Sequence, residues 1–271
     1  MARARGFDPS RLPGFTAVAV LAFVLLYAPI LTLVVYSFNA SESVAVWGGF
    51  SLDWYRIAWA NEQVQEATVR SLVIAAFASA ISTTLATLAA LATTRRGRYR
   101  GQTLIYVMIN QPLMVPEIVT AVALLIFFAS IKVATGYTGL GYLIVAHSAF
   151  CIPFAYLPIR ARLEGMDAAL ETAAADLYAT PFQAFRHVTL PLMAPGIAAG
   201  AMLAFVISLD DVIITEFVKS AGQDTLPTYM LGQLRRAVTP EVNAISTALL
   251  ALTVLLLTAF FLLTRSRDKT A

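Results

Sequence analysis

The stretch that decides the fold is residues 164–195, EGMDAALETAAADLYATPFQAFRHVTLPLMAP, because this polar run lies between two strongly apolar segments. Its first half is rich in alanine and leucine, which favour helix, so a short helix is predicted there. Pro181 and Pro191 break helices, which predicts a turn at Thr180 and a second short helical piece over about 182–188. Such a loop at a membrane face either inserts its small-faced helix into a partner's groove or lies along the lipid headgroups.

Composition assigns the chain to the membrane. Hydrophobic residues make up 59% of the 271 positions and charged residues only 13%, whereas about 25% of residues are charged in soluble proteins. Cys151 is the single cysteine, so neither a disulfide framework nor a cysteine-based metal site is expected.

Six apolar segments are long enough to cross about 30 Å of hydrocarbon. The first has no small-residue cleavage site after it, so we expect an uncleaved span. The sequence predicts an all-α integral membrane protein forming one domain, residues 1–271. The predicted spans are about 15–38, 67–94, 104–129, 140–157, 196–218 and 244–263, with the loop 164–195 between the fourth and fifth.

The positive charges predict the orientation of the chain. Thirteen of the 19 lysine and arginine residues lie in the amino end, the loop 95–100, the tail, and the loop 164–195 together with Arg160 and Arg162. Because positive charge collects on the cytoplasmic side of a membrane, we expect both termini and the loop 164–195 to be cytoplasmic.

Two acids stand inside the fifth predicted span. An ionised carboxylate at mid-membrane costs about 2.5 to 3.5 kcal/mol, and intramembrane acids commonly mark a substrate path. Asp210 and Asp211 are therefore candidate path residues; the alternative is that one of them caps a broken helix or pairs with an arginine. Ser208 and Thr215 either solvate the path or bond back to their helix. His147 is expected to be a packed, hydrogen-bonded helix contact.

Two further positions are candidates for the path. Glu117 follows Pro112 and Pro116, and broken backbone at membrane depth is tolerated where it lines a water-filled cavity; the alternative is that Glu117 caps a helix N-terminus. Trp54 and Tyr55 either stack on an apolar or cationic ligand outside the membrane or anchor the chain at the interface.

Catalytic patterns are not found in the sequence. It contains no G-x-x-x-x-G-K-[ST], H-E-x-x-H or G-x-S-x-G pattern, and its two histidines cannot build a metal site alone. We therefore expect no enzyme in this chain, so that ATP, if it drives transport, is bound and hydrolysed by another subunit.

The loop 164–195 resembles the EAA motif of ABC importer permeases, E-A-A, three residues, G, nine residues, I-x-L-P. Thr172-Ala173-Ala174 stands at E-A-A, Tyr178 at the glycine, and residues 188–191 close the pattern with the spacing intact. Two residues differ from the motif: Thr172 replaces its acidic residue, and Tyr178 replaces its glycine. The resemblance implies a cytoplasmic coupling helix that contacts the ATPase through Glu171, Thr172, Ala173, Ala174, Leu177, Tyr178, Leu190 and Pro191.

The resemblance extends over nearly the whole chain. SLDDVIITEFV (208–218), the segment 225–250, YAPILTLVVYSFNAS (27–41) and FSLDWY (50–55) are similar to the second permease of spermidine/putrescine importers. This implies a type I ABC importer permease in a bacterial inner membrane that forms half of a polyamine path. The implied partners are a homologous permease, two copies of a cytoplasmic ATPase that binds ATP and Mg, and a periplasmic solute-binding protein. Asp210, Asp211, Glu117, Trp54 and Ser208 would line the path.

Other functions stay open at this point. An ABC permease for another small organic or cationic solute has similar segments, whereas an anionic solute would favour a basic lining. A secondary transporter or a channel also places acids in the membrane, but neither needs an ATPase-docking helix. A membrane-bound enzyme is disfavoured, because no cluster of nucleophile, base and metal ligands is found.

Overall fold

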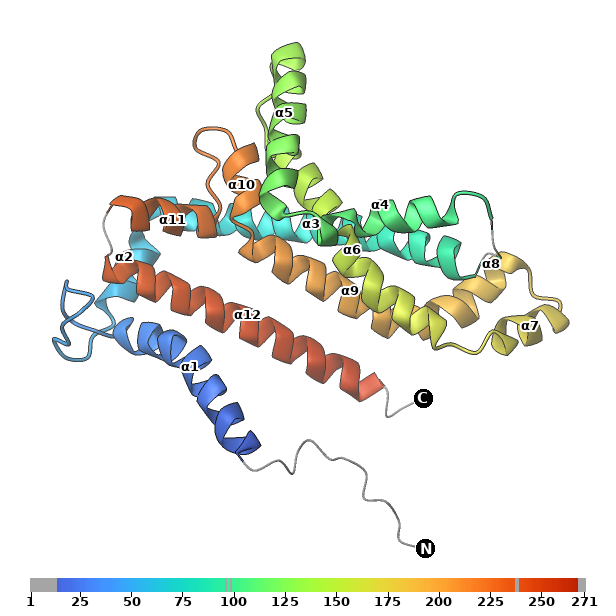
Figure 1. Ribbon diagram of the computed structural model, residues 1–271, viewed down its shortest axis with the longest axis horizontal. Coiled ribbons are helices and arrows are strands. Elements are labelled where there is room, and N and C mark those ends of the chain that lie inside the picture. Colours follow the sequence, from blue (N-terminus) through green and yellow to red (C-terminus); the bar gives the residue numbers. More distant parts are fainter. Residues whose placement is uncertain (1–13, 96, 98, 237–238, 268–271) are drawn as a thin grey trace, which may run out of the picture. The chain divides into compact units, whose positions relative to one another are not determined.

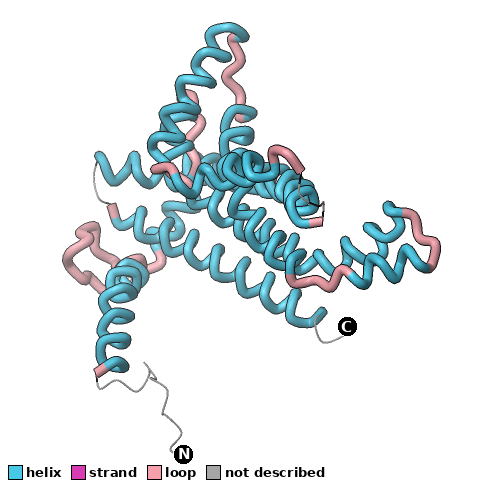
Figure 2. The backbone as a smooth tube through the Cα atoms, turned by 45° about the vertical axis from the view of Figure 1, so that its right-hand side comes forward, coloured by secondary structure: helices cyan, strands magenta, loops and turns pink. Residues whose placement is uncertain are grey.

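The structure is a computed structural model that describes residues 14–95, 97, 99–236 and 239–267. Helix predominates throughout these residues (Figure 2), and their β pairing is limited to one isolated bridge between Asn39 and Phe50. The all-α prediction is confirmed. Several basic residues used in the charge count, in the amino end, at Arg96 and Arg98 and at the end of the tail, lie outside the described residues.

Six helical stretches are long and apolar enough to cross a membrane: Thr16–Tyr36, Glu62–Thr94, Glu117–Thr135, Gly141–Glu164, Pro181–Asp210 and Pro240–Leu262. The predicted number of spans is confirmed among the described residues. The elements are α1 (Phe15–Tyr36), α2 (Asp53–Ala60), α3 (Glu62–Thr94), α4 (Gln102–Met114), α5 (Glu117–Thr135), α6 (Gly141–Glu164), α7 (Ala169–Asp176), α8 (Pro181–Ala184), the π-helix η2 (Phe185–Thr189), α9 (Leu190–Asp210), α10 (Ile213–Val218), α11 (Leu226–Arg236) and α12 (Pro240–Arg267).

The third predicted span, 104–129, is interrupted at Pro116 and Glu117, as the sequence predicts, whereas Pro112 lies inside α4. The break falls at Val115, whose φ of −99° and ψ of 136° are extended. The following Pro116 disfavours helical backbone at the residue before it and carries no N–H of its own. The apolar helix long enough to span is therefore α5, which runs on to Thr135.

The fifth predicted span, 196–218, also has different ends. α9 starts at Leu190, directly after η2, and Pro191 lies in its first turn. The expected break at Pro191 is thus absent, and the predicted piece 182–188 continues into α9 as α8 and η2. The turn predicted at Thr180 falls slightly earlier, at Leu177 and Tyr178, and Thr180 is the extended N-cap of α8, where it forms a capping box with Gln183.

The chain divides into two compact units, and the first contains α1, α2 and the start of α12. Asn39 organises the loop that follows α1. Its side chain bonds the backbone of Ser41, Ser43, Val46 and Gly48 at 2.7 to 3.2 Å. Because one side chain satisfies four backbone groups, this loop has a defined conformation.

The second unit is built on α3, α6 and α9, which lie side by side (Figure 1). Small residues let these helices approach closely, as is usual in membranes. On α9 a small residue recurs every fourth position, at Gly196, Gly200, Ala204 and Ser208, and all four are buried. Most buried residues of α3 are also alanine or serine, namely Ala67, Ser71, Ala75, Ala78, Ser79, Ser82, Ala86 and Ala90, beside the larger Val64, Ile74 and Thr83. α10 packs against α5 and α6 at one end of this bundle.

Candidate functional site

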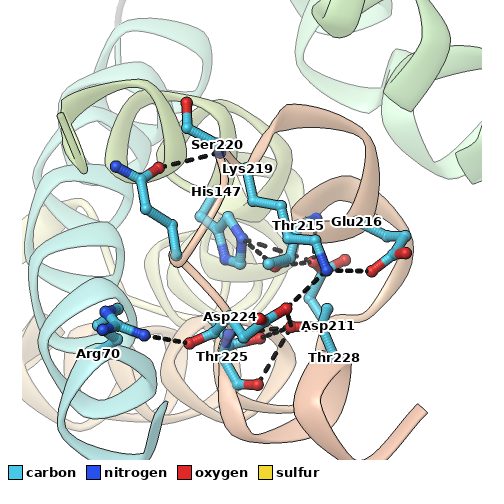
Figure 3. A network of polar contacts seen from close by, with 11 residues as sticks. Arg70, His147, Asp211, Thr215, Glu216, Lys219, Ser220, Asp224, Thr225 and Thr228 are labelled. Carbon is cyan, nitrogen blue, oxygen red and sulfur yellow. Dashed lines mark hydrogen bonds and ion pairs between the residues drawn. The ribbon is translucent and has the colours of Figure 1, made fainter. Parts of the chain in front are cut away.

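The candidate site is the helix break between α9 and α10, where Asp210 and Asp211 lie. Figure 3 shows Asp211 and its polar neighbours at this break. Asp211 is extended (φ −65°, ψ 132°) and only 7% exposed. Its carboxylate accepts bonds from the backbone N–H groups of Ile214 at 3.3 Å and Thr215 at 2.9 Å, and from the Thr215 hydroxyl at 2.8 Å. Asp211 therefore caps the start of α10, the alternative that the sequence left open.

A buried histidine joins the helices around this cap. His147 on α6 contacts Ser208 Oγ through Nδ1 at 2.8 Å and Thr215 Oγ1 through Nε2 at 3.0 Å. Its Nε2 also lies 3.4 Å from Asp211 Oδ2. The predicted packed, hydrogen-bonded role of His147 is confirmed. Ser208 and Thr215 are buried partners in this contact, and the Thr215 hydroxyl also donates back to Asp211, which caps its own helix.

Asp210 and Glu117 are the more accessible acids at the break. Asp210, the last residue of α9, is exposed, whereas its buried neighbour Asp211 lies beyond the end of the helix. Glu117, the first residue of α5, is half-buried, and its carboxyl group is close enough to that of Asp211 for the two to interact electrostatically, since α5 packs against α10. The structure thus brings three acids from two helices to one place, and Glu117 also stabilises the positive end of α5.

Trp54 belongs to the other compact unit. Its indole Nε1 donates to the Asn39 carbonyl at 2.9 Å, which fixes the half-buried ring against the loop after α1. Tyr55 is bonded to Ser37 at 2.7 Å and packs on the ring of Phe38. Both aromatics are therefore integral to the packing of their own unit, and a ligand role for Trp54 stays a prediction.

A second polar cluster follows α10, which the sequence analysis missed (Figure 3). Lys219 Nζ lies 2.5 Å from Glu216 and 2.7 Å from Asp224. Arg70 of α3 donates to the Asp224 carbonyl at 3.1 Å. Burial alone would lower the pKa of Lys219, but the bonds and charges of Asp224 and Glu216 outweigh it and raise the pKa. In the sequence these charges resemble an ordinary solvated loop, and only the close spacing of 216, 219 and 224 indicates a cluster.

The short helix α7 displays an apolar surface. None of its residues is buried, and Tyr178 just beyond it is 96% exposed, beside Leu177 at 82% and Phe182 at 68%. We call Leu177, Tyr178 and Phe182 the loop patch. Tyr178 has a positive φ of 61°, so the left-handed turn of the motif is present even though its glycine is not.

The two candidate acidic positions in the motif differ in their surroundings. Thr172 is exposed, and its hydroxyl donates back to the Ala168 carbonyl at 3.4 Å. Glu171 instead faces inward, where its Oε1 accepts from Arg95 at 3.2 Å and from Thr189 at 2.8 Å. Ala173, Leu190 and Pro191 are exposed and Ala174 is half-buried.

Six apolar helices, a broken fifth span and a short helix displayed between the fourth and fifth define the chain as a transport permease of the ABC importer type. A family model described as binding-protein-dependent transport system inner membrane component matches residues 82–269. The chain belongs to this family.

Relatives with known names cover almost all of it. The putrescine transport system permease protein PotI of Escherichia coli (strain K12) is 38% identical over 263 residues, 96% of this chain and 94% of the relative. The spermidine/putrescine transport system permease protein PotC of the same strain is 35% identical over 91% of this chain and 92% of the relative.

Solved structures agree on the fold. A bacterial ABC transporter involved in the import of the acidic polysaccharide alginate matches with a TM-score of 0.71 at 15% identity, covering 92% of both chains. The MetNI methionine ABC transporter matches with a TM-score of 0.61 at 20% identity, covering 79% of this chain and 95% of that one.

Proposed function

We propose that this permease forms half of the path by which an ABC importer carries putrescine or spermidine across a bacterial inner membrane. The observation that carries the proposal is the gathering of Glu117, Asp210 and Asp211 at one helix break. A polyamine loses hydration as it enters the membrane, and carboxylates compensate each ammonium group by pairing with it. The names of the two relatives, which mention putrescine and spermidine, support the same substrate class.

The three acids and Ser208 have different roles in this proposal. Asp210 and Glu117 pair with the solute, because they are the more accessible carboxylates. Asp211 holds the break open by capping α10, and Ser208 fixes His147 behind it. Trp54 stays the candidate at the outer mouth, on the strength of its sequence position and the aromatic stacking that ammonium groups favour.

The loop 164–195 is proposed to meet the ATPase. The loop patch offers apolar side chains in a polar segment, and exposed apolar groups rimmed by polar residues are typical of interaction sites. Thr172, Ala173, Ala174, Leu190 and Pro191 complete the surface that meets the ATPase, and Glu171 belongs to the coupling region through its internal contacts with Arg95 and Thr189.

The assembly follows from this role. The chain pairs with a homologous permease and rests on two copies of a cytoplasmic ATPase, which bind ATP and Mg and hydrolyse the nucleotide. A periplasmic solute-binding protein delivers the polyamine, and both termini are cytoplasmic. One structural neighbour is described as an alginate ABC transporter in complex with a pentasaccharide-bound periplasmic protein, which is the kind of assembly proposed here.

Uptake by the reconstituted complex tests the proposal. Asp210→Asn should lower putrescine uptake by about tenfold or more, since removing one charge from a partly desolvated pair costs on the order of 1.4 kcal/mol or above. The control is Glu164→Gln, which removes an exposed carboxylate that pairs with Arg160 within one helix. Unchanged uptake by both Asp210→Asn and Glu117→Gln would remove these acids from the path.

A further inference from the structure

We propose that Glu171 is a positioning residue that ties the coupling helix α7 to α3 and to the start of α9, so that movement of the ATPase reaches the membrane helices. This inference rests on the proposed coupling function of the loop. It assigns Glu171 an internal task, whereas the motif places its acidic residue one position later, at the exposed Thr172.

The contacts of Glu171 converge on one carboxylate oxygen. Arg95 Nε lies 3.2 Å from Oε1, and the Thr189 hydroxyl donates to the same atom at 2.8 Å. Arg95 directly follows α3, and Thr189 ends η2 where α9 begins. The Arg95 Nη2 also donates to the Met166 carbonyl at 3.5 Å, just beyond α6. One side chain of α7 thus reaches the ends of two membrane helices and a third through its partner.

The contacts of Glu171 are less exposed than an ordinary ion pair on the surface, so they are better suited to transmit a movement of α7 to the membrane helices. The Glu171 and Arg95 side chains are 27% and 21% exposed, and Thr189 is 5% exposed. Arg160 and Glu164, by contrast, pair four residues apart on one helix and are 32% and 50% exposed. Exposed ion pairs of that kind contribute little to stability. Hydrogen bonds to an ionised group that is partly buried are among the stronger ones.

The helix α7 depends on such a connection. It has only eight residues and buries none of them, so packing alone connects it weakly to the membrane helices. The π-helix η2 lies between α8 and α9, and π segments often occur at functional sites. If the Glu171 contacts are removed, α7 can still bind a partner, but its displacement is no longer passed to α3 and α9.

The test measures solute transported per ATP hydrolysed in the complete complex, together with retention of the ATPase on purification. Glu171→Gln should retain the ATPase and its hydrolysis, while putrescine transported per ATP falls by at least about fivefold, the low end of typical coupling strengths. Arg95→Gln should have the same effect, and the double variant should be no worse, because the two residues act through one contact. Arg95→Lys, which keeps the charge, should restore part of the ratio.

Glu164→Gln is the matched control and should leave the ratio unchanged. The inference is overturned by a normal ratio in Arg95→Gln, or by loss of the ATPase from Glu171→Gln but not from Arg95→Gln, which would make Glu171 a docking contact. A wild-type chain that binds no ATPase would instead contradict the proposed function itself, so the two failures are distinguishable.

Discussion

At the scale of single residues, Asp210 and Asp211 show that neighbours in sequence can have different tasks. Asp211 is buried and bonds the first turn of α10, whereas Asp210 is exposed. The presence of costly acids at this depth could be predicted from sequence, but their division of roles could not. It depends on where α9 ends, and the run SLDDVII contains no helix-breaking residue that marks the place.

Asp211→Asn and Asp210→Asn should therefore affect different quantities: the first should lower the stability of the fold, and the second should lower uptake. Asp211→Asn weakens a charged cap and should lower the free energy of unfolding by about 1 to 2 kcal/mol. Asp210→Asn should leave unfolding unchanged and affect uptake alone. Thermal unfolding in detergent, followed by circular dichroism, compares them, and equal stability of the two variants would contradict the capping role.

Tyr178 is a residue whose conformation and chemistry have opposing effects. Its φ of 61° is unfavourable for a side chain, by about 1 to 2 kcal/mol relative to glycine. Tyr178→Gly should stabilise the permease by up to about that amount but weaken ATPase binding, because the largest side chain of the loop patch is lost. Unfolding and ATPase pull-down measure the two effects separately. Undiminished ATPase binding would exclude Tyr178 from the interface.

The ion pairs of Lys219 should make the stability of the fold depend on pH in the alkaline range. Because its pKa is raised in the folded state, its stabilising contacts are fully present below the ordinary value near 10.5 and are lost as the pH rises through the folded-state pKa. Stability should thus lose this contribution only above about pH 10. Thermal unfolding between pH 8 and 11 should show a smaller alkaline loss for Lys219→Met than for the wild type. Identical curves would mean that the ion pairs do not stabilise the fold.

At the scale of elements, the contact between α6 and α9 depends on glycine. A Cβ atom on Gly200 would lie 2.7 Å from the Ala155 carbonyl oxygen, and one on Gly196 would lie 2.6 Å from the Arg162 Cβ. Both approaches are closer than van der Waals contact, so the helices would have to separate.

Gly200→Ala should consequently destabilise the permease by about 1 to 3 kcal/mol, the range for overpacking. Gly232→Ala in α11 is the matched control, because nothing lies within 4 Å of the added Cβ, and it should gain about 0.5 to 1 kcal/mol from helix propensity. The melting temperatures of the two variants check this, and a tolerated Gly200→Ala would show that α6 and α9 adjust without cost.

The membrane-spanning helices were predictable in type and number among the described residues, but their first and last residues were not. Pro116 breaks the third span because it follows a residue that must be extended, whereas Pro191 is accommodated in the first turn of α9. The same residue type thus ends one helix and lies inside another. Helical backbone lies ahead of both prolines, α4 before Pro116 and η2 before Pro191, so a local pattern does not state which proline ends a helix.

At the scale of the whole molecule, composition and charge were enough for the membrane class, and the spacing of the EAA motif was enough for the superfamily. The contacts that join distant segments were not predictable. Glu171 and Arg95 are 76 positions apart, and Glu117 reaches Asp211 only because α5 packs against α10. Such contacts depend on how the helices are arranged in space, which hydrophobic patterns do not specify.

The most direct test of the polyamine permease is stimulation of ATP hydrolysis in the complete complex, in lipid and with its binding protein. Putrescine, spermidine and a panel of anionic and neutral solutes are compared in the wild type and in Asp210→Asn. We predict stimulation by a polyamine alone, and a weaker response in the variant. Stimulation only by a solute without positive charge would contradict the acid-lined path while leaving the ABC permease intact.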